Sequence, residues 1–260
     1  MKLQRERADE LGIAQTLTDL SDVNRLLEFY EEGIKQAKEA LEIYERIGNT
    51  IDQAQCLSFL ARLFVDSEQF NSAEDAATRA INLVSEKGQE FLVCRLHRIL
   101  GKIHQKRKER EKAIHHFETA LGIASPFNWH DELFWIHRRL AYLFHDEDKP
   151  ESANAHIAQA KLQAVDDPYN LGSAMKTQAK FWHQQGRLEE AKSEALAALE
   201  VFEKLGAAKE AADGRRLLQR IEEAMESRSI RVDPNGGGKF LEMILRPPPV
   251  DSPSLADGTS

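Results

Sequence analysis

Apolar residues recur along this chain at the spacing of amphipathic helices. Between residues 53 and 88, one stretch places apolar side chains at positions i, i+3, i+4 and i+7: Leu57, Leu60, Ala61 and Phe64. This spacing puts them on one face of a helix. Residues 67–69 are polar and predict a turn, after which a second helical pattern runs from Phe70 to Leu83. The unit predicted for this stretch is a helix–turn–helix hairpin.

The same hairpin pattern occurs five times, and small residues keep its phase. Successive copies are offset by 40 residues, except that the last offset is 38. The small residues fall in three registers: Ser21, Ala61, Gly101, Ala141 and Ala179; Gly33, Ala73, Ala113, Ala153 and Ala191; and Ala40, Ala80, Ala120, Ala160 and Ala198. A fixed period of this size indicates stacked copies of one supersecondary unit. Because small side chains let the two helices of a hairpin approach closely, we predict an all-α solenoid.

Residues that tolerate a left-handed backbone mark the ends of the predicted helices. Gly48, Gly88 and Asn128 follow one another at intervals of 40 residues. Gly206 closes the fifth hairpin, and Gly186 lies in its turn. Glycine and asparagine are the residues that adopt positive φ most readily, so they are expected where a helix stops.

The chain divides into three parts on this pattern. Residues 1–206 hold the five repeats, of which the first is degenerate. Residues 207–228 carry one apolar stripe and one polar face, which is typical of a helix that caps a repeat array. Residues 229–260 are rich in glycine and proline and predict a disordered tail. The apolar segment 240–245 inside that tail either docks on the array or is an adventitious apolar patch.

The spacing of the small residues resembles that of the tetratricopeptide repeat. A small residue on the first helix is followed by a second twelve positions later and a third nineteen positions later, over about residues 15–206. The usual repeat has about 34 residues, so a period of 40 implies longer helices. Such repeats are similar to the extended ones of cell-polarity scaffolds and of the C-terminal sensor arms of NACHT-type signalling ATPases. The stretches LEIYERIGN and AKFWHQQGRLEEAKSEALAALEVFEKLG look most like the latter.

The resemblance implies a right-handed superhelix whose first helices line the concave side. It does not extend to the ATPase, because the chain has no GxxxxGK[ST] motif. Residues 235–240 contain glycine and lysine at a different spacing, and Phe240 stands where the metal-binding hydroxyl would be. The chain is therefore either a free-standing adaptor or a fragment of a larger protein.

Composition narrows the classes of function. The chain has 260 residues, of which 42% are apolar and 30% charged, and its net charge is −8. This charge argues against bulk non-specific binding of nucleic acid but allows a local basic surface. Cys56 and Cys94 fall in apolar helical patterns, so we expect buried free thiols and a reducing compartment. The sequence has neither an apolar signal segment nor a membrane-spanning run, and we expect a cytosolic or nuclear protein.

No arrangement of residues in the sequence predicts catalysis. Of the nine histidines, His115 and His116 are adjacent and would point about 100° apart on a helix. Two further histidine pairs lie seven residues apart, which is too far for joint ligation of one ion without other ligands. The sequence has no HExxH motif, no Cys/His metal set and no readable Ser/His/Asp arrangement. We therefore expect no enzymatic activity, no metal and no cofactor.

Basic residues gather on the predicted concave side. In repeats two to five, sixteen inward positions of the first helices hold seven Lys or Arg and no acid. With two aromatic residues, these cations form the predicted binding surface: Arg62, Arg95, Arg98, Lys102, Trp135, Arg138, Tyr142, Lys176 and Lys180. Such a groove suits an extended acidic or phosphorylated peptide. The alternative is that these are ordinary solvated charges that pair with acids of neighbouring helices.

The predicted function is non-catalytic protein–protein interaction, as a scaffold or adaptor. The partner would be a protein or peptide, no membrane contact is expected, and the oligomeric state is left open. Some tetratricopeptide domains clamp the C-terminal carboxylate of heat-shock chaperones, but the asparagines of that clamp are missing here. RNA binding in the same basic groove is the alternative function, and a steep salt dependence with an oligonucleotide would favour it.

Overall fold

The computed structural model describes residues 2–85, 88–164 and 166–232, with side chains from 9 to 228 within these ranges. Every regular element in this part of the chain is a helix, which confirms the all-α prediction. The α-helices are α1 (Lys2–Leu26), α2 (Tyr30–Ile47), α3 (Thr50–Asp66), α4 (Phe70–Val84), α5 (Glu90–Lys106), α6 (Arg110–Ala124), α7 (His130–Asp146), α8 (Pro150–Gln163), α9 (Pro168–Gln184), α10 (Leu188–Lys204) and α11 (Ala208–Val232). A short 3-10 helix, Ser125–Phe127, follows α6.

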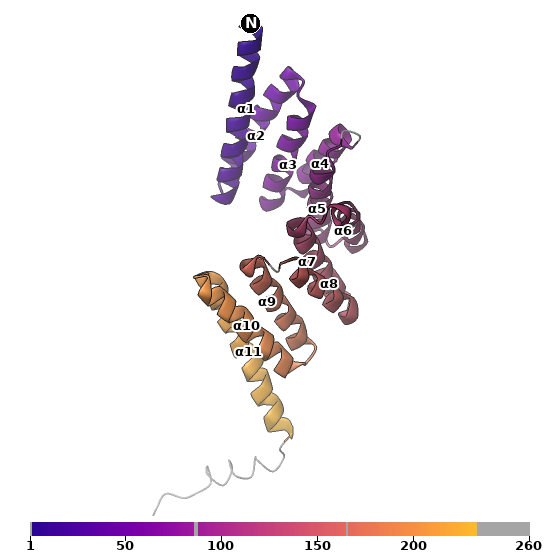
Figure 1. The fold of residues 1–260 in the computed structure, drawn as a ribbon, viewed down its shortest axis with the longest axis vertical. Helices are drawn as coiled ribbons and strands as arrows, with labels where there is room; N and C mark the ends of the chain where they lie inside the picture. Colours follow the sequence, from indigo (N-terminus) through magenta and orange to yellow (C-terminus); the bar gives the residue numbers. More distant parts are fainter. Residues whose placement is uncertain (1, 86–87, 165, 233–260) are drawn as a thin grey trace, which may run out of the picture.

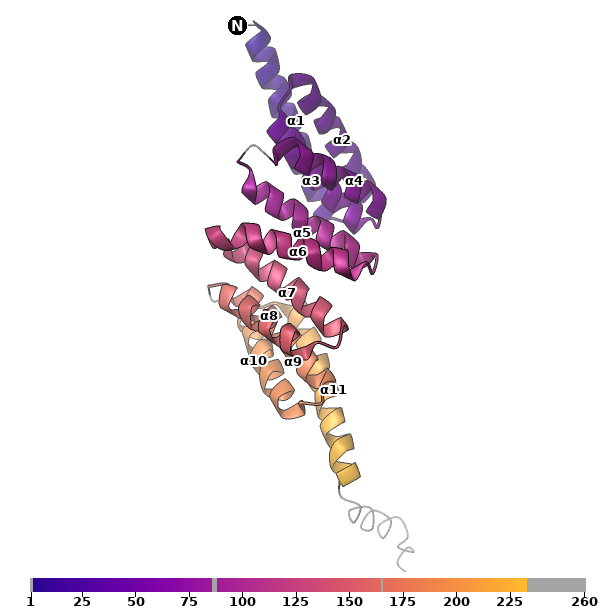
Figure 2. The same ribbon diagram turned by 90° about the vertical axis from the view of Figure 1, so that its right-hand side faces the viewer.

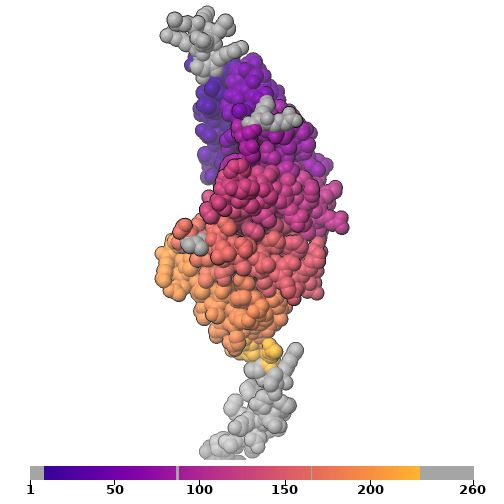
Figure 3. Space-filling model, turned by 45° about the vertical axis from the view of Figure 1, so that its right-hand side comes forward, coloured from indigo at the N-terminus to yellow at the C-terminus, as the bar shows by residue number. Residues whose placement is uncertain are grey.

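The helices pack in consecutive pairs, from α1 with α2 to α9 with α10, and each pair packs against the next. The first helices of three successive pairs begin 40 residues apart, at Thr50, Glu90 and His130, and α9 follows at Pro168. Figures 1 and 2 show the hairpins stacked in chain order. In the space-filling view they pack directly on one another (Figure 3). The predicted solenoid of helical hairpins is therefore confirmed.

The odd-numbered helices form one side of the stack. Each of them contacts the next odd-numbered helix, whereas successive even-numbered helices make no comparable contact within the described ranges. In Figure 1 the stack bends so that both ends lie to one side of its middle, and α1, α3, α5 and α7 are the helices nearer that side. We call the surface formed by these successively contacting helices, α1, α3, α5, α7, α9 and α11, the inner face.

Small residues lie where the helices of a hairpin cross. The alanines of the three predicted registers are buried, as Ala61, Ala73 and Ala80 illustrate. A methyl group added at Gly101 would lie 2.8 Å from the ring of Phe117, well inside normal carbon–carbon contact. The small residues therefore have the structural role that their spacing predicts.

The turns contain more left-handed residues than the sequence indicated. The glycines and the asparagine predicted at helix ends and in the last turn all have positive φ: Gly48, Gly88, Asn128, Gly186 and Gly206. Four further residues with φ between 56° and 64° lie in the turns inside the hairpins: Glu28, Glu68, Lys108 and Asp148. These four are 40 residues apart, and Gly186 occupies the same place in the last hairpin. A non-glycine residue in this region costs about 1–2 kcal/mol.

Backbone hydrogen bonds show why these turns need a left-handed residue. In the turn after α3, the N–H of Gln69 donates to the carbonyl of Phe64 at 2.7 Å, and Glu68 donates to Val65 at 3.2 Å. This pair of bonds closes a Schellman motif, which requires positive φ at the residue after the C-cap, here Glu68. The C-terminal α11 packs on α10 through buried Leu217 and Ile221 and extends four residues past the predicted boundary at 228.

The predicted disordered tail begins at residue 229, but residues 229–232 belong to α11. Residues 233–260, which hold the rest of that tail and its apolar stretch 240–245, lie outside the described residues. No helix in the described part is long and apolar enough to span a membrane.

Candidate functional site

All nine residues predicted for the binding surface lie on odd-numbered helices. One is on α3, three are on α5, three on α7 and two on α9, and each is partly buried. The inner face thus carries all of them. We divide the inner face into two parts. The N-terminal part consists of α1, α3, α5 and the first turn of α7, and the C-terminal part consists of the rest of α7 with α9 and α11. The predicted residues have different surroundings in the two parts.

Two arginines of α5 share one carboxylate. Glu132, in the first turn of α7, is only 7% exposed and faces α5. The Nε of Arg98 donates to Glu132 at 2.6 Å, and the Nε of Arg95 lies 4.0 Å from the same carboxylate. Burial lowers the pKa of Arg95, and the charge of Glu132 opposes that effect. Both arginines therefore have an acidic partner within the chain, and they share its single charge.

A second ionic network joins α1, α3 and α5. Asp66, the last residue of α3, accepts hydrogen bonds from Lys102 and Arg25, each at 3.0 Å. Arg25 also donates to Asp22 at 2.8 Å, and Arg62 lies 3.6 Å from Asp22. Burial would raise the pKa of Asp66, but its bonds to Lys102 and Arg25 hold that pKa below its usual range. This network accounts for the remaining predicted cations of the N-terminal part.

The N-terminal part of the inner face therefore contains its own counter-ions. Asp22, Asp66 and Glu132 lie on odd-numbered helices but outside the sixteen inward positions considered from the sequence. The sixteen inward positions considered from the sequence therefore leave out the acids that pair with the cations of this part. The alternative, pairing with acids of neighbouring helices, is confirmed for Arg62, Arg95, Arg98 and Lys102.

Arg138 has a different environment in the C-terminal part. Its guanidinium lies 5.4 Å from the ring centre of Trp135 and 5.9 Å from that of Tyr142, within the range of cation–π contacts. Among the described residues, its buried Nε has no hydrogen-bond partner. Both rings pack against the hydrophobic core, so they form the wall of the surface. Arg138 is held by aromatic rings rather than by a carboxylate.

Tyr142 links α7 to α9 in an electropositive setting. Its hydroxyl lies 3.2 Å from that of Thr177 on α9, within hydrogen-bond distance. Burial would raise the pKa of Tyr142, but the bond to Thr177 and the charges of Arg138 and Lys180 lower it. The charges of Arg138 and Lys180 thus place a positive potential at this point of the inner face.

Several cations of the C-terminal part lack an acidic partner. In the described ranges, three cations besides Arg138 have no carboxylate oxygen within 4.0 Å: Arg139 on α7, Lys180 on α9 and Arg220 on α11. Lys176 lies 3.8 Å from Asp213, but Asp213 also pairs with Arg216. The number of cations therefore exceeds the number of acids that could neutralise them here.

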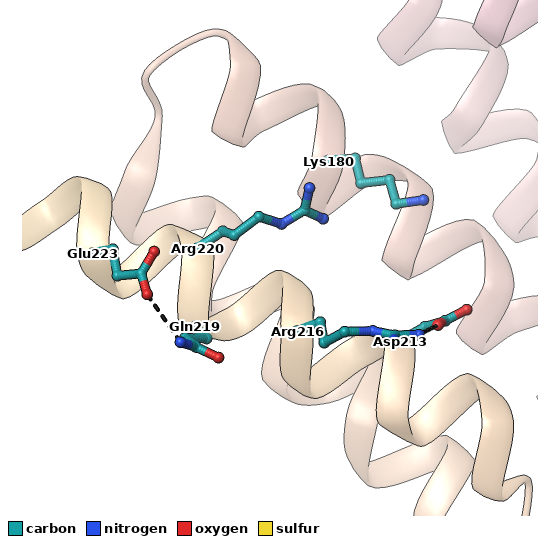
Figure 4. Close-up of a pocket in the computed structure, with 6 residues that line it drawn as sticks. All are labelled: Lys180, Asp213, Arg216, Gln219, Arg220 and Glu223. Atoms are coloured by element: carbon teal, nitrogen blue, oxygen red, sulfur yellow. Dashed lines mark hydrogen bonds and ion pairs between the residues drawn. The ribbon is translucent and has the colours of Figure 1, made fainter.

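Open hollows lie along the inner face. One of about 500 Å³ lies among α3, α5 and α7 and is lined by Asp66, Lys102 and Arg139, among others. A hollow of about 260 Å³ lies among α7, α9 and α11, and one of about 490 Å³ adjoins it between α9 and α11. Lys180 and Arg220 line both of the latter two (Figure 4).

The structure also joins histidines that the sequence had left apart. The Nδ1 atoms of His97 on α5 and His116 on α6 lie 3.0 Å apart, and those of His137 on α7 and His156 on α8 do the same. The second pair is the first one shifted by 40 residues. The sequence does contain a signal for these pairs. The two histidines of each pair are nineteen residues apart, and the same distance separates the small residues of the first and third registers, such as Ala61 and Ala80.

The histidine pairs are packed inside their hairpins. His104 stacks on His116 with ring centres 5.2 Å apart, and Phe144 stacks on His156 at the same distance. Burial, together with nearby histidines, lowers the pKa of His116 to about 4, and the same causes lower that of His137 to about 4. The described residues contain no group of three or more ligands that could hold a metal ion.

The two cysteines are buried free thiols, as predicted. The thiol of Cys56 lies 3.1 Å from the carbonyl of Ala37, and that of Cys94 lies 3.5 Å from the carbonyl of Ala120. Burial raises the pKa of each thiol to about 12, so neither is a reactive thiolate at neutral pH.

Comparisons with known proteins identify the type of repeat. A tetratricopeptide repeat model matches residues 12–86. The structure is similar to BtubC (BKLC) from P. vanneervenii, with TM-score 0.68 and 18% identity, covering 89% of this chain and 99% of that one. A Rap protein in complex with Competence and Sporulation Factor has TM-score 0.62 and 16% identity, covering 84% of this chain and 66% of that one.

A Podosopora anserina protein with nearly identical TPR-like repeats has TM-score 0.60 and 11% identity, covering 74% of this chain and 95% of that one. No curated protein matches the sequence. The resemblance to sensor arms of NACHT-type ATPases stays a prediction. The chain therefore has the fold of a tetratricopeptide-like helical solenoid, and its first repeats match the tetratricopeptide model.

Proposed function

We propose that this chain is a non-catalytic interaction scaffold that binds an acidic or phosphorylated segment of a partner protein on its inner face. The observation that carries the proposal is the set of partly buried cations without a carboxylate partner in the described C-terminal part. Arg138 and Lys180 belong to the surface predicted from the sequence. Arg139, which lines the hollow beside Asp66, and the exposed Arg220 extend it.

A partly buried cation without a partner has lost hydration and gained little in return. An incoming carboxylate or phosphate restores that interaction through charge-assisted hydrogen bonds, which are about twice as strong as neutral ones. The cations of the N-terminal part would first have to leave Asp22, Asp66 or Glu132. The acidic ligand is therefore expected to bind mainly to the C-terminal part.

The fold supports a role in binding. Extended solenoids offer long concave surfaces, and the Rap protein with the same type of fold was solved in complex with Competence and Sporulation Factor. The described residues also provide no ligand set for a metal and no low-pKa thiol. These observations favour a scaffold over an enzyme.

The test is the binding of a fluorescein-labelled peptide of ten alternating Glu and Asp residues, measured by anisotropy. Arg138→Gln combined with Arg139→Gln is expected to weaken binding about tenfold, which corresponds to about 1.4 kcal/mol. The matched control is Arg46→Gln with Arg79→Gln, two exposed arginines of the even-numbered helices α2 and α4. The control should bind like the unaltered chain.

The same titration distinguishes the alternative function. A single-stranded RNA oligonucleotide that binds with steep salt dependence, while the acidic peptide does not bind, would replace the proposal with RNA recognition. Equal binding of the acidic peptide by both double variants would show that the inner face is not its site.

A further inference from the structure

We propose that the hollow among α7, α9 and α11 is a phosphate subsite, which holds a phosphorylated side chain of the bound segment. We call it the phosphate hollow; its polar lining includes Tyr142, His145, Lys180, His183 and Arg220. The inference rests on the proposed function and adds to it the kind of residue that the C-terminal part recognises.

Two cations from different helices line the phosphate hollow. Lys180 comes from α9 and Arg220 from α11, and both line this hollow and the adjoining one. In Figure 4 the side chain of Arg220 extends from α11 toward the helix that carries Lys180. A group bound between them would contact a point charge and a planar guanidinium at once.

The acids nearby are already engaged or lie at the rim. Asp213 pairs with Arg216 and lies 3.8 Å from Lys176, and Glu223 accepts a hydrogen bond from Gln219 at 2.9 Å (Figure 4). Asp146 lines the hollow, but it is an exposed residue at the end of α7. Lys180 and Arg220 are thus left for an external anion.

The walls of the phosphate hollow are fixed by packing. Phe181 and Leu217 are each 1% exposed. His145 stacks on Phe181 with ring centres 4.1 Å apart and is hydrogen bonded to Gln184. Tyr142 packs edge-on against Phe181 at 5.4 Å. A preformed hollow of about 260 Å³ needs little rearrangement before a ligand binds.

The arrangement fits a phosphate better than a carboxylate. A phosphorylated side chain carries a charge of about −1.5 to −2 and three acceptor oxygens, so it can bind cations on two helices together. A carboxylate has one charge and two oxygens, which one arginine satisfies in a bidentate pair. The positive potential that lowers the pKa of Tyr142 acts on the same space.

The experiment uses the full chain and three otherwise identical acidic peptides, with phosphoserine, serine or glutamate at one central position. Calorimetry at physiological ionic strength is expected to show at least about tenfold tighter binding of the phosphoserine peptide than of either other peptide. Lys180→Ala with Arg220→Ala should abolish this preference, so that the phosphoserine and serine peptides bind with affinities within about twofold of each other. Arg216→Ala is the matched control, because this arginine lies one turn from Arg220 but already pairs with Asp213.

Each outcome decides between the two proposals. If the serine peptide binds but phosphoserine adds nothing, or if glutamate equals phosphoserine, the phosphate subsite is refuted and the acidic-peptide scaffold stands. If no peptide binds, the proposed function fails. The subsite is then tested alone by following backbone amide shifts during titration with inorganic phosphate or acetate. Shifts around Lys180 and Arg220 with phosphate, absent in the double alanine variant, support the subsite, and their absence overturns it.

Discussion

The two parts of the inner face carry similar cations and differ in the acids around them. In the N-terminal part, Arg98 and Lys102 bind Glu132 and Asp66 at 2.6 and 3.0 Å. In the described C-terminal part, Lys180 has no such partner, and Arg138 rests on aromatic rings. Counting basic residues therefore overestimates the surface available to a ligand, because a cation that already holds a carboxylate must release it first.

The difference also separates stability from binding. The ion pairs of the N-terminal part join α1, α3, α5 and α7 and so connect successive hairpins. Repeat arrays depend on such contacts between neighbours, since each repeat touches only the adjacent ones. We infer that the N-terminal part uses its charges to hold the array together, and that the C-terminal part keeps them for a partner.

The largest effect is expected from removing the buried acid of the N-terminal part. Glu132→Gln leaves Arg95 and Arg98 without their carboxylate. It should lower the free energy of unfolding by about 2 kcal/mol. This is less than the loss of a fully buried ion pair would cost, because both arginines are partly exposed. The urea midpoint measures this. Asp146→Asn, an exposed acid without a described ion pair, is the matched change in the C-terminal part and should shift the midpoint little. Equal shifts would remove the distinction between the two parts.

A pH titration is expected to have an effect of about the same size for each histidine pair, because the pairs lie inside the hairpins. The pKa values of His116 and His137 are lowered to about 4, so the folded chain binds fewer protons than the unfolded chain below pH 6.5. The contribution of these neutral histidines to the free energy of unfolding is then fully present above pH 6.5, and it is lost as the pH falls toward 4. Allowing for partial exposure, we expect a loss of about 2 kcal/mol for each of the two pairs.

Urea midpoints between pH 7.5 and 4.5 test this expectation. His137→Gln with His156→Gln should remove about half of the pH dependence, and His130→Gln, an exposed histidine bonded to Gln163, should remove none. Asp66 keeps its charge over this range, because its pKa is lowered. The ion pairs of Asp66 with Lys102 and Arg25 should therefore remain intact at a pH where protonation of the histidine pairs destabilises the chain. A flat profile for the unaltered chain would contradict the expectation.

The fold was predictable from the sequence because small residues and helix stops report local geometry. Ala61 and Gly101 mark close helix crossings wherever they recur, and a period of 40 fixes their phase. The ion pairs were not predictable in this way. Lys102 and Asp66 are 36 residues apart, and whether they meet depends on how two neighbouring hairpins stack. The histidine pairs were partly predictable. Their nineteen-residue offset repeats along the sequence, but no general rule says that histidines at this offset contact each other.

A smaller effect should follow from releasing one cation of the N-terminal part. Asp66→Asn removes the carboxylate that binds Arg25 and Lys102, beside the hollow of about 500 Å³. Affinity for the acidic peptide should then rise about threefold, or about 0.7 kcal/mol, because Lys102 becomes available to the ligand. Peptide anisotropy measures the change, and Asp75→Asn on α4 serves as the control. No gain in affinity would mean that paired charges are not what limits binding in this part.

The smallest change in stability is expected at the left-handed turn residues, which both parts of the array contain. Lys108 and Asp148 occupy the same left-handed turn position in neighbouring hairpins, with φ of 63° and 56°. Glycine removes a strain of about 1–2 kcal/mol, but it also adds backbone freedom to the unfolded chain, worth roughly 0.5–1 kcal/mol. Each change to glycine should therefore stabilise the chain by about 0.5 kcal/mol, whereas Gly186→Ala, with φ of 74°, should destabilise it by about 1 kcal/mol. Equal gains for Lys108→Gly and Asp148→Gly in thermal melts would show that the backbone is uniform along the array. Unequal gains would show that the two parts differ in backbone strain as well as in charge.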